Sequence, residues 1–342
     1  MPYVIHHNDH DGKCSAAIVM NELLPVFVKD QIVCIEYNYG YNVNWDEVLN
    51  PENFLPNGKE ICYIVDVALN DTIFNVIKML VEHNVKVVHI DHHQGTLDYL
   101  GKDGVSDILS SENVIQFYRM DISATMLCWV YSCMTEEERQ RPMEIEFDFT
   151  PTYSHVMINL NDRGKAREYR INPGVFYIDD YDIWRHSTPT TMEFHYGLMT
   201  VEDTNPKLDK LWGDILYGNE RVLRPFIDKG SAIFEYKKME YERILKRGTS
   251  IIIHTPKDVF PSGTALGFIV NNPCDSFMFE SIKKDYDVCI AYWCDDKNSK
   301  WRYSFRSSDT SMFDCNKFAQ LFGGSGHEHS SGCVSTTMLE FE

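Results

Sequence analysis

The sequence predicts an α/β protein in which a parallel, doubly wound sheet comes first and a smaller α/β unit follows, the two joined by a helical connector. Two observations predict this fold class. Residues 1–95 alternate short apolar runs with stretches whose apolar residues recur at helical spacing, the pattern of strand–helix–strand units. Residues 249–342 contain a second set of β-like runs, after a long charged stretch with helical character. A chain of 342 residues is long enough for two such units.

Four apolar runs in the first part are expected to be strands, and they read YVIHH, IVCIEYN, ICYIVDVAL and VKVVHIDHH. A helix is expected over CSAAIVMNELL, opening at a turn that Gly12 allows. Either Asp71 or Thr72 is expected to cap the next helix, whose apolar residues recur at helical spacing (Ile73, Val76, Ile77 and Leu80).

The later part of the chain sets the domain boundaries. Residues 121–141 predict a helix with an apolar face, residues 135–175 an inserted hairpin or lid, and FYIDDYDIWRH (176–186) a strand that ends in acids. The first domain is therefore expected to cover residues 1–205, the helical connector residues 206–248 and the second domain residues 249–342. In the second domain TSIIIHT, VCIAYWC and WRYSFRS are expected strands, and NKFAQLFG is an expected helix.

Charge and composition restrict the class of partner. The net charge of −19 disfavours long duplex nucleic acid and anionic membranes, unless a local basic groove compensates, but it also simply keeps a protein soluble. A small anionic substrate is easier to accommodate, since bound metal ions reverse the sign locally. The ten cysteines are scattered, and no apolar run approaches the length of a membrane span. We therefore expect a cytoplasmic protein with reduced thiols.

Acids and imidazoles gather where the expected strands end. HHNDHDG places His6, His7, Asp9 and Asp11 after the first strand, Asp66 interrupts IVDVAL, and IDHHQ places Asp91, His92 and His93 after the fourth. Each motif alone is also explained by a polar turn or an ordinary strand-end aspartate. In a doubly wound sheet, however, these ends meet at one edge, where ligands bind. Together they predict a metal site, with His89 as a structural histidine inside its strand.

The donor types indicate which metal this site prefers. Carboxylates dominate and no cysteine takes part, which favours Mn²⁺ over Zn²⁺. Two ions about 3.5–4 Å apart would clamp a phosphoryl group and activate a water. The acidic run at 179–182 offers Asp180 and Asp182 to complete the site, with Asp179 less well placed and Asp162 as the fallback.

The C-terminal part carries a different kind of motif. GGSGHEHSSG brings glycines that let backbone N–H groups approach a phosphate, and His327 and Arg306 are candidates for contacts to an anionic substrate. A glycine-rich loop is also a common turn, and the basic residues around it are equally explained as a solvated face.

These motifs, in this order, resemble the DHH superfamily of phosphoesterases with a C-terminal DHHA1 domain, over nearly the whole chain. HHNDHDG, the aspartate of IVDVAL, IDHH and DYDIW resemble its first four motifs, and YSFRS and GGSGHEHSSG resemble the DHHA1 signatures, with serines at 325, 330 and 331 where the family has glycine and alanines. The group includes RecJ-type exonucleases, oligoribonucleases and cyclic-dinucleotide phosphodiesterases.

The resemblance implies roles for these residues. It implies two Mn²⁺ ions, or Mg²⁺ in their place, held by His6 or His7 with Asp9, Asp11, Asp66, His92 and Asp180, and with Asp66 as the bridge. It implies that His93 contacts the scissile phosphate and that Asp91 supports the histidines. It also implies that the DHHA1 domain binds a terminal nucleotide through Ser304, Arg306, Gly323, Gly324, Gly326 and His327.

The expected activity is Mn²⁺-dependent hydrolysis of short oligonucleotides or of linear or cyclic dinucleotides. Two alternatives stay open: a RecJ-like exonuclease specific for single strands, and a catalytically silent DHH scaffold. The silent scaffold would be marked by lost ligands, and here all of them are retained. The oligomeric state also stays open, a homodimer included.

Overall fold

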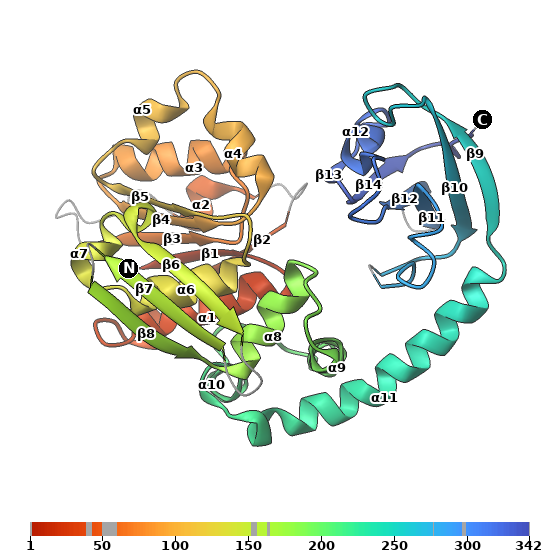
Figure 1. Cartoon of the computed structure of the whole chain (residues 1–342). Helices are drawn as coiled ribbons and strands as arrows, with labels where there is room; N and C mark the ends of the chain where they lie inside the picture. Colours follow the sequence, from red (N-terminus) through yellow and green to blue (C-terminus); the bar gives the residue numbers. More distant parts are fainter. Residues whose placement is uncertain are drawn as a thin grey trace. The chain divides into compact units, whose positions relative to one another are not determined.

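The computed structural model describes residues 2–38, 43–49, 60–151, 156–162, 165–275, 277–295 and 299–341. It divides into two units, Met1–Ile233 and Phe234–Glu342, and the division falls inside the long helix α11 (Glu220–Leu245). The two units are described separately (Figure 1). The described part of the chain contains no helix with the length and hydrophobicity that a membrane span requires.

A five-stranded parallel sheet forms the centre of the first unit. Its order is β2-β1-β3-β4-β5, with bounds Val33–Tyr37, Tyr3–His7, Ile61–Val65, Lys86–Asp91 and Val114–Tyr118. Every neighbouring pair runs parallel, so the carboxyl ends of all five strands lie at one edge of the sheet. The four expected strands and the predicted fold class are confirmed, and β5 is an additional strand.

Helices cover both faces of this sheet. On one face α1 (His10–Leu23) and α6 (Ala124–Cys133) pack on residues such as Val4, Val65 and Ile90. On the other face α3 (Asp71–Glu82) packs on Ile5 and Ile64, with α4 (Gln94–Leu100) and α5 (Val105–Leu109) beside it. Strands that are buried on both faces explain why these runs are almost continuously apolar.

Gly12 lies inside the first turn of α1, so the helix begins earlier than expected. A Cβ atom at Gly12 would lie 2.4 Å from the backbone oxygen of His7. The glycine therefore lets α1 start immediately against the end of β1. Asn70, and neither Asp71 nor Thr72, caps α3, because its side chain accepts a hydrogen bond from the backbone N–H of Ile73.

The region from 121 to 186 differs most from expectation. The helix expected over 121–141 is broken into α6 and α7 (Glu136–Arg139), because Met134 is extended and Thr135 starts a new capping box. The inserted segment is a three-stranded antiparallel sheet of β6 (Glu146–Pro151), β7 (Val156–Asp162) and β8 (Lys165–Ile171). The side chain of Asp162, the fallback ligand, lies outside what the structure describes.

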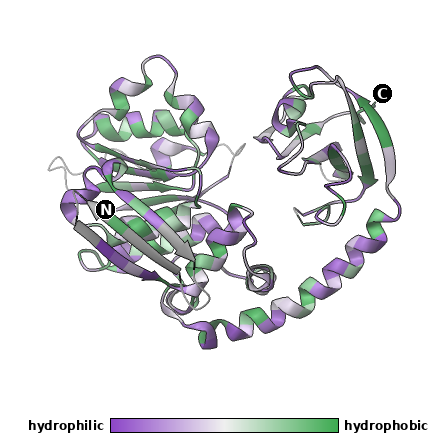
Figure 2. Cartoon of the chain, in the orientation of Figure 1, coloured by the Kyte–Doolittle hydropathy of each residue, from purple (hydrophilic) through white to green (hydrophobic). Residues whose placement is uncertain are grey.

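The prediction of a strand at 176–186 is wrong. Residues 176–182 belong to helix α8 (Pro173–Asp182), which begins at a proline in its first position after Asn172, and residues 183–186 follow that helix. Residues 174–180 are all buried in α8, so the short apolar run imitates a strand. Helices α9 (Pro189–Leu198), α10 (Asp209–Tyr217) and α11 follow. Figure 2 shows α11 alternating between hydrophilic and apolar residues along its length.

The second unit contains a six-stranded mixed sheet of order β13-β14-β12-β11-β10-β9. The strands are Ser325–His327, Ser330–Ser335, Lys300–Arg306, Val288–Asp295, Thr264–Asn271 and Thr249–His254, and α12 spans Cys315–Gln320. The three expected strands (β9, β11 and β12) and the helix are present, and β10, β13 and β14 are additional. The glycine-rich segment is no free loop, since most of it pairs as the β13–β14 hairpin.

Candidate metal centre

Acids and imidazoles from three parallel strands meet at one edge of the first sheet. His7 is the last residue of β1, Asp66 directly follows β3, and Asp91 ends β4 just before His92 and His93. These strands lie side by side in the sheet, and their carboxyl ends share one edge. This is the position at which doubly wound sheets bind ligands.

Three groups of side chains at this edge are close enough to hold a cation. In each group the ligand atoms lie within 4.8 Å of one another, and the groups are Asp66–His92–His93, His7–Asp9–Asp66 and Asp11–His92–Asp182. Asp66 belongs to two of the groups and His92 to two. The three groups therefore form one continuous cluster with room for more than one ion.

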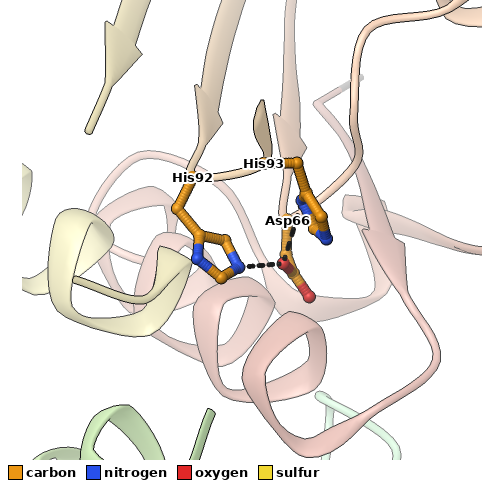
Figure 3. A group of neighbouring side chains, drawn as sticks. All are labelled: Asp66, His92 and His93. Carbon is orange, nitrogen blue, oxygen red and sulfur yellow. Dashed lines mark ion pairs between the residues drawn. The ribbon is translucent and has the colours of Figure 1, made fainter. Parts of the chain in front are cut away.

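Asp66 occupies the centre of the cluster, and its two oxygens face different histidines. Oδ1 lies 3.2 Å from Nε2 of His92 and 3.9 Å from Nδ1 of His93, and both rings approach it in Figure 3. Oδ2 lies 3.7 Å from Nδ1 of His7. A carboxylate that faces two sets of imidazoles in this way has the geometry of a ligand that could be shared by two cations.

The backbone at Asp66 supports this position. Its φ angle is +58°, which aspartate and asparagine tolerate better than other residues with side chains. Its backbone N–H donates to the carbonyl of Ile90 on β4 at 3.0 Å, which ties the turn to the neighbouring strand. The left-handed turn thus ends β3 and leaves the carboxylate at the sheet edge.

Asp9 and Asp11 are held by the starts of two helices. Asp9 is the N-cap of α1 and accepts from the backbone N–H of Gly12 at 2.8 Å. Asp11 accepts from the backbone N–H groups of Ala124 and Thr125, at 2.9 and 2.8 Å, in the first turn of α6. The hydrogen bond from Gly12 is among the contacts that lower the pKa of Asp9.

A second layer of polar side chains fixes the start of α6. Ser123 caps the helix and receives an additional contact, since its backbone N–H donates to Oδ1 of Asp179 at 2.8 Å. Arg185 Nη1 donates to the other oxygen of Asp179 at 2.9 Å. Asp179 therefore supports the helix end that holds Asp11 and is not itself in the cluster.

Asp182 and Asp180 have different surroundings. Asp182 ends α8, and its Oδ2 lies 3.3 Å from Nε2 of His92. Asp180 is fully buried, and its carboxylate accepts from the backbone N–H and hydroxyl of Ser187 and from the hydroxyl of Thr191 at 2.5 Å. The structure brings Asp182 into the cluster and leaves Asp180 outside it. The hydrogen bonds of Asp180 instead stabilise the turn after α8.

The two histidines of the first motif are also separated. His7 Nδ1 lies 2.7 Å from Asp9 Oδ2 and belongs to the cluster. His6 is buried, and its Nδ1 lies 2.8 Å from the carbonyl oxygen of His7. Burial lowers the pKa of His6 to about 4. His89 is a structural histidine, as expected, because its ring contacts the hydroxyl of Tyr118 and the carbonyl of Val67.

His93 is oriented by a carboxylate. Its Nδ1 lies 2.8 Å from Oδ1 of Asp91, while Oδ2 of Asp91 accepts from the hydroxyl of Thr96. Burial alone would lower the pKa of His93, but the Asp91 carboxylate outweighs it, and the net pKa is raised. An imidazole that donates Nδ1–H to a fixed carboxylate has a defined orientation, with Nε2 on the side of the ring away from that carboxylate.

The carboxylates of the cluster repel one another, because several negative charges are buried close together. Burial raises the pKa of Asp66 well above its usual value, and the neighbouring Asp9 and Asp11 raise it further. Burial and Asp11 raise the pKa of Asp182 in the same direction. By contrast, burial dominates at His92 and lowers its pKa, which favours the neutral imidazole that binds a metal.

A divalent metal fits this arrangement. Oδ2 of Asp66 is buried and accepts no hydrogen bond from any described residue, which is costly for a carboxylate oxygen unless a cation pairs with it. The cluster offers carboxylate and imidazole donors and no thiolate, the donor set that suits a hard or intermediate divalent ion. The residues present therefore match the requirement for bound cations.

Replacing Thr96 with valine tests the support of Asp91. The hydroxyl of Thr96 donates to Asp91 and accepts from the backbone N–H of Leu69 at 2.8 Å, so both partners lose their contact in Thr96→Val. We expect the free energy of unfolding, measured by urea titration, to fall by about 1–3 kcal/mol. Thr72→Val on the exposed surface of α3 is the matched control and should change it little. Equal effects of the two substitutions would contradict the assignment.

Most of the candidate substrate residues of the second unit lie on two strands of its sheet that are separated by one strand. Ser304 and Arg306 lie on β12, Gly326 and His327 lie on β13, and β14 runs between the two strands. Arg306 Nη1 donates to the backbone oxygen of Ser331 at 3.2 Å. Gly323 (φ +73°) and Gly326 (φ +153°) have backbone conformations that favour glycine, and a Cβ at Gly324 would lie 2.2 Å from the backbone oxygen of Gly332. The hairpin itself therefore explains Gly324 and Gly326, and the turn after α12 explains Gly323.

Sequence reasoning missed the residues that support the cluster. Ser123, Thr125 and Thr96 act through backbone and hydroxyl contacts, and Asp179 acts through Ser123. The local signal for one of them was present, since the serine of DISAT is a typical N-cap before an apolar helix. No local signal connects that helix start to Asp11, which lies more than 110 residues earlier.

Comparisons with known proteins complete this description. No family model matches the sequence. An uncharacterised protein of Acanthamoeba polyphaga mimivirus is 29% identical over 167 residues, which cover 46% of this chain and 35% of that protein. The match thus spans about a third of the length of the curated relative.

Several solved structures are similar to this chain at low identity. The DHH domain of a protein assigned to a family of ribosomal proteins has a TM-score of 0.54 and 14% identity, covering 98% of this chain and 82% of that chain. An uncharacterised protein from Helicobacter pylori has a TM-score of 0.40 and 15% identity, and the match covers 100% of this chain and 94% of that chain. RecJ from Thermus thermophilus in complex with Mn²⁺ has a TM-score of 0.41 and 9% identity, and the match covers 98% of this chain and 49% of that chain.

The likeness at a TM-score of 0.54 shows the fold. The chain therefore has the fold of a DHH domain, the fold that its strand-end motifs predict.

Proposed function

We propose that this chain is a Mn²⁺-dependent phosphodiesterase that hydrolyses short oligonucleotides or linear or cyclic dinucleotides. One observation carries the proposal: Asp66 directs its two oxygens toward different histidines, and one of these oxygens accepts no hydrogen bond from the described residues. A buried carboxylate shared between two groups of donors is the arrangement that a pair of divalent ions requires.

The residues divide naturally between two cation positions. His7, Asp9 and Asp66 would hold one ion, and Asp11, His92 and Asp182 would hold the other, with Asp66 between them. When bound, such a pair supplies Lewis acidity to a water molecule and to the phosphoryl oxygens.

The protein itself holds the metal ligands in position and supplies a positively charged histidine. The N-terminal N–H groups of α6 hold Asp11, and the turn after β3 holds Asp66, so that the ligands are in place before a substrate arrives. Asp91 holds His93 through Nδ1, and Nε2 of the protonated ring is the atom that would donate to a phosphoryl oxygen. The raised pKa of His93 favours the protonated ring, which strengthens such a contact to an anion.

The net negative charge of the protein supports the proposal of a short substrate. With a net charge of −19, the protein repels a long polyanion more strongly than a dinucleotide, because the repulsion grows with the number of phosphates near the surface. In this proposal Ser304, Arg306, His327 and the glycines of the hairpin recognise a terminal nucleotide, as the resemblance implies.

A panel of substrates with Mn²⁺ tests the function directly. The panel contains a dinucleotide, cyclic dinucleotides, a cyclic mononucleotide, a nucleoside 3′,5′-bisphosphate and a long single strand. We expect turnover of one of the dinucleotides at a rate well above that of the long strand at physiological salt. Equal or faster turnover of the long strand would favour a RecJ-like exonuclease, and no turnover of any substrate would favour a silent scaffold.

Stabilisation by Mn²⁺ should depend on pH with a definite sign. Without a cation, burial raises the pKa of Asp66 and Asp182, so these two carboxyls contribute stability below about pH 4 that is lost as pH rises through their raised pKa. Mn²⁺ binds the ionised forms and relieves this repulsion. We expect the Mn²⁺-induced rise in Tm, measured by calorimetry, to be larger at pH 8 than at pH 5. A potassium salt at equal ionic strength is the control, and a rise independent of pH would contradict the assignment.

A further inference from the structure

A pocket of about 390 Å³ in the first unit adjoins the metal centre. One part of its lining consists of Asp9, Asp11 and Asp182, which belong to the candidate metal ligands. Another part comes from helices α8 and α9 and carries aromatic rings, chiefly Tyr177, Tyr181, Phe194 and His195. The pocket thus joins a cation-binding end to an aromatic end, and the proposed cation chemistry accounts for only the first.

The aromatic lining contains two groups of rings in mutual contact. Tyr181 and His195 stack at a centroid distance of 3.4 Å with 10° between their planes. Tyr177 and Phe194 lie 5.4 Å apart with tilted planes, and His10 meets the edge of His195 at 5.6 Å. Phe194 is fully buried, whereas Tyr181 and His195 are partly exposed, so this stacked pair can offer a rigid surface to a flat ligand at a small cost in conformational entropy.

Charge in the pocket does not suit a chain of phosphates. Lys13 is the lysine among its lining residues, and its Nζ already donates to the hydroxyl of Thr204 at 3.1 Å and lies 3.8 Å from Oε2 of Glu36. Burial lowers the pKa of His195 to about 3, so this ring is neutral near pH 7. A neutral aromatic wall favours a neutral aromatic group over an anion.

We infer that the α8–α9 end of this pocket is a subsite for the nucleobase of a nucleotide whose phosphate lies at the metal centre. The inference rests on the proposed function for the position of the phosphate and adds that the first unit itself recognises a base. The volume lies in the range of about 300–1,000 Å³ that is typical of small-molecule sites. Stacking tolerates any base, so the subsite distinguishes nucleotides from inorganic phosphates more than one base from another.

The experiment compares AMP with ribose 5-phosphate, which carries the same phosphate and sugar without the base. Binding of each to the full chain is measured by calorimetry, with and without Mn²⁺. We expect AMP to bind about 10-fold more tightly than ribose 5-phosphate, since stacking of one base accounts for about 5- to 150-fold in affinity. His195→Ala should remove most of this preference, His195→Phe should retain it, and His83→Ala at an exposed histidine should leave it unchanged.

A second variant covers the case in which His195→Ala does not fold. Met199 lines the pocket and is 59% exposed, so Met199→Trp should fold while obstructing the aromatic end. It should weaken AMP and leave ribose 5-phosphate nearly unaffected. Equal affinity for the two ligands in the wild-type chain, or a preference that neither variant reduces, would overturn the subsite.

The two proposals fail in different ways. A preference for AMP that depends on His195, in a chain that hydrolyses no diester, would refute the phosphodiesterase and keep the base subsite. Hydrolysis of dinucleotides without any preference for AMP over ribose 5-phosphate would keep the phosphodiesterase and refute the subsite.

Discussion

Asp66→Asn is expected to lower Mn²⁺-dependent phosphodiester hydrolysis by more than about 100-fold, because loss of a residue that only supports a ligand already costs about 10–100-fold. Asparagine is the right replacement, since it tolerates the φ angle of +58° at this position and keeps the size of the side chain. Turnover is measured on the best substrate of the panel, and Mn²⁺ affinity by calorimetry.

The same substitution should not destabilise the metal-free protein. The carboxylate of Asp66 is buried beside Asp9 and Asp11 with one oxygen that accepts no hydrogen bond from a described residue, and a neutral amide removes that repulsion. We expect an unchanged or higher Tm without Mn²⁺ and a much smaller rise in Tm on its addition. A variant with near-normal turnover and an unchanged Mn²⁺-induced shift would exclude the bridging role.

Asp182→Asn and Asp180→Asn should have opposite phenotypes, although only one residue separates them. Asp182 faces His92 in the cluster, so its amide should weaken Mn²⁺ binding by about 10-fold or more while the metal-free fold keeps its stability. Asp180 accepts hydrogen bonds from Ser187 and Thr191, so its amide should lower the free energy of unfolding by about 1–3 kcal/mol.

The turn that Asp180 pins explains the size of its effect. Trp184 and His186 both have positive φ angles, of +58° and +48°, and such residues persist only when surrounding contacts hold them. Each variant is the matched control of the other. Loss of Mn²⁺ affinity in Asp180→Asn together with normal affinity in Asp182→Asn would reverse the assignment and restore Asp180 as the ligand that the family resemblance implies.

The sheet edge was predictable because its signal is local. Each strand is a short apolar run, and the chemistry-bearing residues follow it directly, so the motifs at His7, Asp66 and His92 could be placed before any contact was known. Parallel pairing then brings the three strand ends together without further information. The sequence left His6 and His7 as alternatives, and burial of His6 distinguishes their surroundings.

The choice between Asp180 and Asp182 depended on secondary structure that the pattern misrepresented. In a strand these two side chains would point to the same face, whereas in helix α8 they diverge by about 200°. The run FYI resembles a strand because the helix is buried all around its first turns, and the start signal was the preceding Asn172–Pro173 pair.

The supporting contacts depend on tertiary structure and have no sequence pattern of their own. Asp11 and the start of α6 are more than 110 residues apart, and Asp179 reaches Ser123 across 56 residues. Hydroxyl and backbone groups of this kind are common everywhere in a protein. Their role follows only from the positions that the fold gives them.

Anomalous diffraction from crystals of the chain soaked with Mn²⁺ tests the central claim most directly. The account predicts two Mn²⁺ peaks about 3.5–4 Å apart, both in contact with Asp66, with His7 on one side and His92 on the other. No peak at this edge of the sheet at saturating Mn²⁺, or peaks that do not contact Asp66, would contradict it.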